Sequence, residues 1–357
     1  MKAKKNHLNQ LDAVVWLQTA FLGDMILSTG AFNLAHHEAP HLKQYLITSP
    51  VGEAALKEHQ ALSGIFSVKK KRIDFIYQAI KIGQTLKKMG FNSDNCILIQ
   101  LHRSTRSTLI SKLIGLPILT FEETSLSSFA NWHVKRVAVF HECIRNSLPL
   151  ELFGIRRDTI LGALPSLPIK KSCPHSQEFK DSCFKIGIAP GSAWQTKKWP
   201  IEKFSYLVKL LTRHQNIQIV LLGSKKEASL VKSIRNVAQS DFENGKIIDL
   251  VGKTKLEDLR YVYPQLKLLI SNDSSPIHYA SAFNVPTIAI FGATVSAMGF
   301  GPLAAGSTVV ERIDLKCRPC SAHGPNKCPL KHFKCMEEIS VDEVYQQVKK
   351  HLPAKSH

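Results

Sequence analysis

The sequence has no long apolar stretch, and no run approaches the ~18 consecutive apolar residues that a membrane-spanning helix needs. The basic N-terminal stretch, MKAKKNHLNQLD, is followed by only a short apolar run before Gly23 and Asp24 interrupt it. That pattern argues against a secretory signal peptide, so we expect a cytoplasmic protein. A hydrophobic content of 44 % is normal for a globular protein, and a length of 357 residues predicts two domains.

Acidic residues are scarce: 28 Asp and Glu stand against 47 Lys and Arg, which gives a net charge of +19. This excess predicts an anionic partner, namely nucleic acid, an acidic membrane surface or a phosphorylated substrate, although a merely basic surface is the simpler alternative. The sequence has no recognised nucleic-acid-binding motif and no interleaved aromatic and basic residues, so we expect no nucleic acid. The basic runs VKKKR (68–72) and IKK (169–171) favour work near an anionic bilayer.

Short apolar runs recur along the chain with enough residues between them for helices. In the first half we predict strands near 13–18, 44–48, 97–101 and 136–140. In the second half the predicted strands are KIGIAP, IQIVLLG, KIIDLVG, KLLIS and PTIAIFG. Nearly continuous apolar strands joined by helical crossovers indicate parallel sheets covered on both faces.

A stretch rich in Pro, Ser and Lys, residues 164–182, lacks periodicity and reads as a linker. We therefore predict an α/β fold of two doubly wound, Rossmann-like domains, 1–165 and 183–339, joined by a linker over 166–182 and facing a central cleft. A last helix is predicted over 340–352, where Ser340 and Glu343 form a capping box. Its apolar stripe is typical of packing.

The first strand feeds a helix through a turn that carries an acid, within VVWLQTAFLGDMILSTGAF (14–32). Such turns seat phosphates in many α/β proteins, but Asp24 would repel a phosphate. Two interpretations stay open for this carboxylate. It serves as a general base, or it caps a helix that begins near Met25.

Two stretches of the second half combine polar groups with predicted strand ends. APGSAWQTKKWP (189–200) brings Ser192 and Lys197 to the start of a helix whose first residue we predict to be Pro200, an arrangement that suits an anion. A solvated basic loop is the alternative. In LLISNDSSPIHYASAF, Asp273, Ser274 and Ser275 follow a strand and His278 lies one turn into a helix. They can hold a diphosphate, or they can form a helix cap with a structural histidine.

Four of the eight cysteines cluster in CRPCSAHGPNKCPLKHFKC as Cys317, Cys320, Cys328 and Cys335. A quartet that begins with C-x-x-C is typical of closed zinc sites, whereas reduced thiols in a loop and a redox-labile pair are the alternatives. We assign neither a metal nor a cofactor.

Five stretches occur in the order and spacing of glycosyltransferase family 9: FLGDMILSTGAF, LHRSTRS, PGSAWQTKKWP, GSKKE and NDSSPIHYASAFNVPTIAIFGAT. Over nearly its whole length the sequence resembles that family, and within it the ADP-heptose:lipopolysaccharide heptosyltransferases, nearest the second heptosyltransferase. The resemblance implies a GT-B fold with an N-terminal acceptor domain and a C-terminal ADP-heptose domain. It also allows a final segment, 340–357, that crosses back to the N-terminal domain.

The resemblance also implies roles for individual residues. Lys197 matches the family lysine that contacts the donor phosphates, and Glu227 falls where an acid hydrogen-bonds the donor ribose. Arg106 lies where the family has a basic residue on the acceptor side. The loop and helix start that hold the sugar and diphosphate in the family match Asp273, Ser274, Ser275 and His278.

The sequence departs from the family at two places. Gly30 replaces a usual proline, and Ser275-Pro276 replaces a usual Gly-Leu. Because proline removes one N–H donor, the diphosphate contacts are expected to differ in detail.

Taken together, the residues and the resemblance predict an inverting transferase that moves heptose from ADP-heptose to the lipopolysaccharide inner core by single displacement, with Asp24 as general base. It would work at the cytoplasmic face of the inner membrane. Two alternatives are a same-fold transferase that uses another nucleotide sugar and a non-catalytic protein that binds anions or nucleic acid. A base at position 24 favours the transferases, because an anion binder gains nothing from a carboxylate there.

Overall fold

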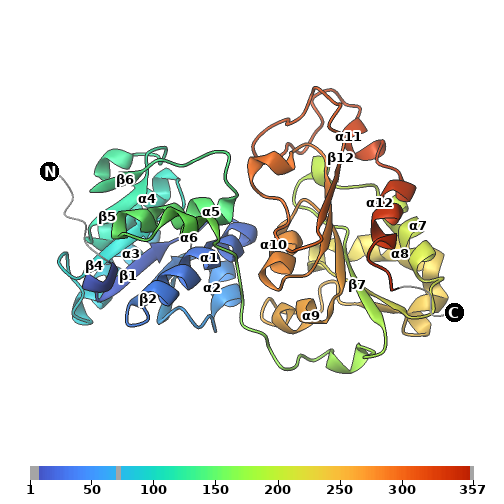
Figure 1. The fold of residues 1–357 in the computed structure, drawn as a ribbon, viewed down its shortest axis with the longest axis horizontal. Helices are drawn as coiled ribbons and strands as arrows, with labels where there is room; N and C mark the ends of the chain where they lie inside the picture. The colour runs from blue at the N-terminus through green and yellow to red at the C-terminus, as the bar shows by residue number, and fades with distance from the viewer. Residues whose placement is uncertain (1–7, 70–73, 354–357) are drawn as a thin grey trace. The chain divides into compact units, whose positions relative to one another are not determined.

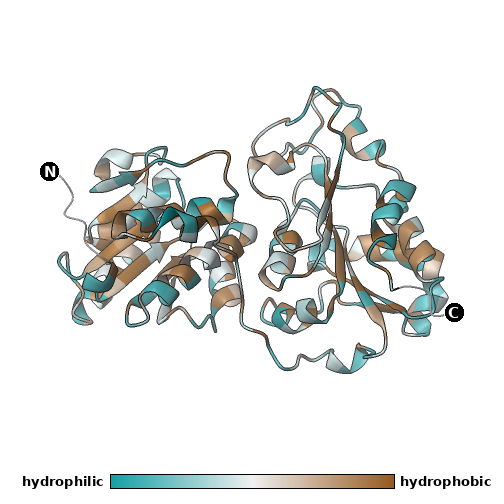
Figure 2. Cartoon of the chain, in the orientation of Figure 1, coloured by the Kyte–Doolittle hydropathy of each residue, from teal (hydrophilic) through white to brown (hydrophobic). Residues whose placement is uncertain are grey.

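The computed structural model describes residues 8–69 and 74–353. Residues 70–72 of the basic run VKKKR, and the first seven residues of the basic N-terminal stretch, lie outside the described residues. The contacts of the chain divide it into two units, residues 1–168 and 169–357. Each unit holds a six-stranded sheet with helices beside it (Figure 1), and hydrophobic residues concentrate in the strands (Figure 2).

The first unit is an all-parallel sheet in the order β3-β2-β1-β4-β5-β6. Its strands are β1 Ala13–Leu17, β2 Lys43–Thr48, β3 Gly64–Ser67, β4 Cys96–Gln100, β5 Ile118–Phe121 and β6 Trp132–Val134. The strand predicted at 136–140 is wrong, since the chain turns there and β6 ends before it. The backbone carbonyls of Val137 and Ala138 accept hydrogen bonds from the Arg145 guanidinium instead of pairing in a ladder.

Helices cover both faces of this first sheet. The α-helices are α1 Leu22–Glu38, α2 Pro50–Leu56, α3 Asp74–Lys88, α4 Thr105–Ile114, α5 Glu142–Ser147 and α6 Arg157–Leu161, with 3-10 turns η1 Leu8–Gln10, η2 Ser127–Phe129 and η3 Leu148–Phe153. Because side chains alternate along a strand, neighbouring residues of β1 reach opposite faces. Trp16 packs against Phe32 of α1, whereas Val15 joins a core cluster with Ile82 of α3 and Ile110 of α4.

Gly30, where the family has proline, lies at the contact between α1 and α5. A Cβ at this position would fall 2.4 Å from the Cys143 sulfur of α5 and 3.3 Å from the backbone oxygen of Leu164. The absence of a side chain therefore lets these segments approach α1 closely.

The second unit is also all parallel, in the order β12-β11-β10-β7-β8-β9. Its strands are β7 Phe184–Ala189, β8 Ile217–Leu221, β9 Ile247–Asp249, β10 Leu268–Asn272, β11 Thr287–Phe291 and β12 Thr308–Glu311. Its helical elements are η4 Ser176–Glu178, η5 Gln195–Lys197, α7 Ile201–Leu211, η6 Lys225–Glu227, α8 Ala228–Glu243, α9 Leu259–Gln265, α10 Ser275–Ala282, η7 Ser296–Met298, α11 Lys334–Glu337 and α12 Val341–Lys349. All five apolar runs predicted as strands are confirmed, and only the edge strand β12 was not predicted.

Helices α7 and α12 pack on the core of this second unit. Helix α7 begins at Ile201 with Pro200 as its N-cap, one residue later than predicted, and buries Phe204 and Leu207. Helix α12 has the predicted capping box between Ser340 and Glu343, and Val344 and Val348 of its predicted stripe are buried. Helix α12 contacts α7, β11 and β12.

The start of the predicted linker makes hydrogen bonds on each side of the division between the two units, which falls after residue 168. The backbone N–H of Ser166 donates to the Thr29 hydroxyl at 3.1 Å, within the first unit. The Lys170 ammonium donates to the Asp258 carboxylate at 3.0 Å, within the second unit. Among the described residues, no helix has both the length and the apolar composition that crossing a bilayer requires.

Candidate functional site

Three loops of the second unit meet at one edge of its sheet. Strand β10 lies between β7 and β11 and is parallel to both, so the loops that follow these strands leave from the same edge. Ligands of open α/β sheets bind at the carboxyl ends of the strands. The predicted residues Ser192 and Lys197 follow β7, and Asp273 and Ser274 follow β10.

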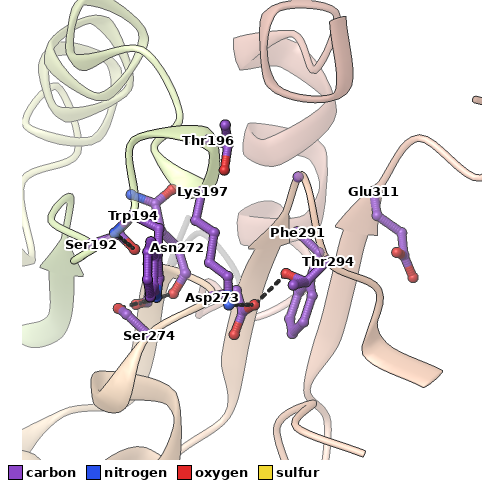
Figure 3. Close-up of polar contacts among 12 residues, drawn as sticks. Ser192, Trp194, Thr196, Lys197, Asn272, Asp273, Ser274, Phe291, Thr294 and Glu311 are labelled. Atoms are coloured by element: carbon purple, nitrogen blue, oxygen red, sulfur yellow. Dashed lines mark hydrogen bonds and ion pairs between the residues drawn. The ribbon is translucent and has the colours of Figure 1, made fainter. Parts of the chain in front are cut away.

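A buried ion pair joins these loops (Figure 3). The Lys197 ammonium lies 2.6 Å from the Asp273 carboxylate, and only 9 % and 7 % of the two residues is exposed. The Thr294 hydroxyl, from the loop after β11, donates to the same carboxylate oxygen at 2.5 Å. A buried charge needs this kind of pairing. The interpretation of a solvated basic loop is therefore wrong for Lys197.

Asn272, the last residue of β10, fixes the loop that carries Lys197. Its side-chain amide donates to the Pro190 carbonyl at 2.8 Å, and its side-chain oxygen accepts from the Trp199 backbone N–H at 3.0 Å. The Trp199 indole N–H donates to the Ile339 carbonyl at 3.0 Å, and the ring packs edge-on against Phe204. The two ends of the loop are thus held by one side chain.

The start of α10 places the predicted serines and histidine. Ser274 is the N-cap residue but makes no side-chain cap bond, and its hydroxyl donates to the Gly191 carbonyl at 3.4 Å. The predicted helix cap is therefore wrong for the Ser274 side chain. Ser275 begins the helix, and the next residue is Pro276. His278 lies on the first turn of α10, is buried, and has its ring 6.2 Å from that of Phe300.

Glu227 lies against the glycine of the first loop. Its carboxylate accepts from the Ser224 backbone N–H at 2.6 Å in a capping box. A Cβ built on Gly191 would fall 1.5 Å from a Glu227 carboxylate oxygen, so a side chain there would require Glu227 to move. Ser192, the next residue, is buried, and its hydroxyl accepts from the Trp194 N–H at 3.4 Å. The structure therefore places Glu227 beside the loop that carries Ser192 and Lys197.

The cysteine-rich segment packs on the same loop. Gly324, at φ +80°, comes so close that a Cβ there would lie 3.0 Å from Lys197 Cε. The Thr196 hydroxyl donates to the Pro325 carbonyl. The Arg318 guanidinium donates to the Thr294 carbonyl at 2.7 Å and pairs with Glu311 at 2.7 Å. The segment thus packs against Lys197 and bonds to the backbone of Thr294, whose hydroxyl donates to Asp273.

All four cysteines of this segment, Cys317, Cys320, Cys328 and Cys335, are free thiols. Within residues 8–69 and 74–353, no group of three or more His, Cys, Asp and Glu side chains is placed to hold a metal ion.

In the first unit, Asp24 lies in the first turn of α1. The helix begins at Leu22 with Phe21 as its N-cap, so the prediction that Asp24 caps a helix beginning near Met25 is wrong. Burial raises the pKa of the Asp24 carboxyl to about 7, and the nearby Glu142 carboxylate adds to the rise. Hydrogen bonds from backbone amides at Phe21 and Asp24, and the Arg136 cation, oppose this rise in pKa.

The surroundings of Asp24 include charged groups that the sequence did not mark. The Glu142 carboxylate pairs with both Arg136 and Arg145, the latter at 3.0 Å. Arg106, predicted on the acceptor side, is exposed in the first turn of α4, with its guanidinium 5.9 Å from the centre of the Phe75 ring. Because β1 and β4 are parallel neighbours, α1 and α4 both begin at the carboxyl edge of this sheet.

A hydroxyl network lies at the same edge. The His102 imidazole Nδ1 is 2.8 Å from the Thr19 hydroxyl and 2.9 Å from the Ser107 hydroxyl. Thr19 and His102 lie two residues beyond the ends of β1 and β4, which is a sequence signal that could have identified them. The structure therefore brings the predicted donor residues together in the second unit and places Asp24 and Arg106 in the first.

Comparisons with known proteins agree with this architecture. The sequence model described as glycosyltransferase family 9 (heptosyltransferase) matches residues 83–331. A lipooligosaccharide heptosyltransferase 2 of Campylobacter jejuni is 25 % identical over 332 residues, which cover 92 % of this chain and 96 % of that protein.

Two solved structures are similar over 95 % of this chain. A family 9 glycosyl transferase from Veillonella parvula has a TM-score of 0.81 at 21 % identity, with 96 % of its chain covered. The Escherichia coli ADP-heptose LPS heptosyltransferase II has a TM-score of 0.75 at 18 % identity, with 98 % of its chain covered. These likenesses confirm the predicted GT-B class of fold with two doubly wound α/β units.

The raised pKa of Asp24 predicts a pH-dependent penalty on stability. Between about pH 4 and pH 7 the folded protein keeps a proton on Asp24 that the unfolded chain, with a carboxyl pKa of 3.8, has lost. Stability contributed by this group therefore falls as the pH rises through that window. Asparagine does not titrate, so the unfolding midpoint of Asp24→Asn should rise relative to the parent protein between about pH 4.5 and pH 8.

Thermal unfolding followed by circular dichroism at several pH values tests this expectation. Glu38→Gln, which removes an exposed carboxyl from the other end of α1, is the matched control. A difference between the Asp24→Asn and parent midpoints that stays constant across the window would show that Asp24 ionises normally.

Proposed function

The chain belongs to glycosyltransferase family 9, the heptosyltransferases, and on that premise we propose that it transfers heptose from ADP-heptose to the inner core of lipopolysaccharide. The observation that carries the proposal is the buried Lys197–Asp273 pair at the carboxyl edge of the second sheet. It provides a fixed cation where an open α/β sheet binds its ligands. The names of the similar proteins, a lipooligosaccharide heptosyltransferase and an ADP-heptose LPS heptosyltransferase, support the proposed donor and acceptor.

The donor is held by residues of the second unit. An ammonium group has three N–H donors, and the pair with Asp273 uses one of them, so Lys197 has donors to offer the diphosphate. Ser192 and Ser274 add hydroxyls beside Lys197 (Figure 3), and Ser275 and His278 add a hydroxyl and an imidazole on the first turn of α10. The Glu227 carboxylate, held against Gly191, accepts hydrogen bonds from the ribose hydroxyls.

The reaction requires one base. In its ionised form, Asp24 accepts the proton of the acceptor hydroxyl as that oxygen attacks the anomeric carbon of the heptose. The bond from this carbon to the ADP oxygen breaks, ADP leaves with the electron pair, and the anomeric centre inverts. Lys197 stabilises the charge that develops on the departing diphosphate. A pKa of about 7 places Asp24 near the optimum for a general base at neutral pH.

The acceptor is held by the first unit, where Arg106 lies at the same sheet edge as Asp24. A guanidinium suits phosphate and carboxylate groups on the acceptor. The net charge of +19 supports peripheral work at the cytoplasmic face of the inner membrane, which carries anionic lipid.

The donor site predicts the effect of removing the lysine. Lys197→Ala should weaken binding of ADP and ADP-heptose together, by about 10- to 150-fold, because a charge-assisted contact is worth ~1.5–3 kcal/mol. Isothermal titration calorimetry measures both affinities, and Lys198→Ala, on the adjacent lysine, is the matched control. The parent protein should bind ADP-sugars more tightly than UDP- and GDP-sugars. Unchanged ADP affinity in folded Lys197→Ala protein would remove Lys197 from the donor site.

The mechanism predicts a separate effect on turnover. Asparagine keeps the shape of Asp24 but is no base, so Asp24→Asn should lower kcat by about 10²- to 10⁴-fold while ADP-heptose affinity stays near that of the parent protein. Initial rates of ADP release with purified inner-core acceptor give kcat, with Glu38→Gln as the control. Turnover close to that of the parent would exclude Asp24 as the base and leave the donor site untouched.

A further inference from the structure

Two helices on one face of the first sheet expose apolar side chains that its core does not use. Helices α3 and α4 pack side by side, and their inward residues, including Ile82 and Ile110, fill the core beneath them. Their outward faces still carry Tyr77, Ile80, Leu109 and Leu113, which are 71 %, 41 %, 39 % and 37 % exposed. These outward residues form what we call the α3–α4 face.

The charges of the same helices are strongly one-sided. One acid, Asp74, stands against five basic residues: Lys81, Lys87, Lys88, Arg106 and Lys112. The helices α1, α2 and α5, on the opposite face of the sheet, have more acidic than basic residues, with Lys and Arg counted as basic. They hold one arginine, Arg145, and four acids: Asp24, Glu38, Glu53 and Glu142. Among these helices the excess of basic residues is therefore confined to α3 and α4. On the opposite face Glu142 is buried and pairs with Arg136 and Arg145, and burial raises the pKa of Asp24.

Basic and apolar residues alternate within the outward stripe of α4. Arg106, Leu109, Lys112 and Leu113 are spaced three or four residues apart, or adjoin, so they share one side of the helix, and all four are exposed. Lysines beside aliphatic side chains suit the boundary between headgroups and acyl chains of a bilayer, where the cations meet lipid phosphates. Nucleic acid would pair with the cations but gain little from exposed leucines.

We propose that the α3–α4 face docks on an anionic lipid bilayer. The proposal rests on the proposed function, because an acceptor anchored in lipid has to be met at the membrane surface. Tyr77, Leu109 and Leu113 enter the headgroup region, and the lysines of α3 bind the phosphates of anionic lipids. The contact combines electrostatic attraction with shallow insertion of apolar side chains. It is reversible, because it needs neither a covalently attached lipid nor a membrane-spanning helix.

The position of the face relative to Asp24 fits this use. Helix α4 begins at the carboxyl end of β4, next to β1, and α1 with Asp24 begins at the carboxyl end of β1. The Arg106 guanidinium, 5.9 Å from the Phe75 ring, ties the starts of α3 and α4 together. The face thus ends at the sheet edge that carries the proposed base. An acceptor whose lipid part remains in the bilayer can present its sugar at that edge.

Vesicle co-sedimentation of the full chain tests the proposal. The probes are vesicles of phosphatidylcholine alone and of phosphatidylcholine mixed with phosphatidylglycerol. A charge variant, Lys81→Gln/Lys87→Gln/Lys88→Gln, and an apolar variant, Tyr77→Ser/Leu109→Ser/Leu113→Ser, change the face itself. The matched control changes exposed residues of α7 and α8 in the second unit: Tyr206→Ser, Lys209→Gln, Lys232→Gln and Val237→Ser.

The parent protein should bind the phosphatidylglycerol vesicles and not the neutral ones, and added salt should weaken binding. The charge variant should lose on the order of 100-fold in partitioning, because each lysine near an anionic surface contributes a factor of about five. The apolar variant should also partition less, and the control should stay within about twofold of the parent. Equal partitioning by all four proteins, or salt-sensitive binding of duplex DNA without binding of vesicles, would overturn the proposal.

An assay with a lipid-free inner-core oligosaccharide separates this proposal from the proposed function. The face variants should transfer heptose to the soluble acceptor at the parent rate, because they leave the donor site and Asp24 unchanged. If no protein transfers heptose but the face variants still lose vesicle binding, the proposed function fails and the docking face stands. If all the proteins transfer heptose at the parent rate and the face variants bind vesicles as the parent does, the docking proposal is wrong and the proposed function is unaffected.

Discussion

The second unit depends on one buried ion pair, between Lys197 and Asp273. Removing two charges from water costs several kcal/mol per ion, and only close contact and further hydrogen bonds offset that cost. Here the contact is 2.6 Å, and the Thr294 hydroxyl adds a bond to the same carboxylate oxygen. Because these residues follow β7, β10 and β11, the pair fixes three loops at once.

In the first unit, the main electrostatic feature is the buried carboxyl group of Asp24. A carboxylate at the end of β1 would repel a phosphate, but the residues that we propose for the donor lie in the second unit, whereas Asp24 lies in the first. Burial and Glu142 raise the pKa of Asp24, while backbone amides and Arg136 limit the rise. The outcome is a pKa of about 7, which lowers the stability that this group contributes at neutral pH. If the donor binds the second unit as we propose, Asp24 at the turn after β1 does not meet the donor phosphates, and its carboxylate does not repel them.

Sequence patterns predicted most of the buried strands, and the edge strand β9, but missed the buried strand β5 and the edge strands β3, β6 and β12. Strands such as Ile217–Leu221 are buried on both faces and read as continuous apolar runs. The edge strands β3 and β12 are only partly buried, so their runs are short and mixed. The apolar run at 136–140 forms no strand. The carbonyls of Val137 and Ala138 accept hydrogen bonds from the Arg145 guanidinium of α5, a contact that the sequence pattern does not reveal.

The candidate site shows the same limit. Lys197 and Asp273 could be singled out by their motifs, but their pairing joins residues 76 positions apart and depends on strand order. Thr294 carried a signal, because it follows β11 as Asp273 follows β10. The sequence contains no signal for Arg318, because its hydrogen bond to the Thr294 carbonyl depends on how the cysteine-rich segment folds back onto the loop after β11. Local chemistry is visible in the sequence, whereas contacts between loops require the structure.

The most direct test of the account is the anomeric configuration of the transferred heptose. One carboxylate and one displacement invert the anomeric centre, whereas a covalent intermediate on the enzyme would retain it. Transfer from ADP-heptose of defined configuration to an inner-core acceptor, followed by NMR of the isolated product, distinguishes the two. The account predicts a heptosidic linkage of inverted configuration and one ADP released per heptose transferred. A retained configuration would contradict single displacement with Asp24 as the base.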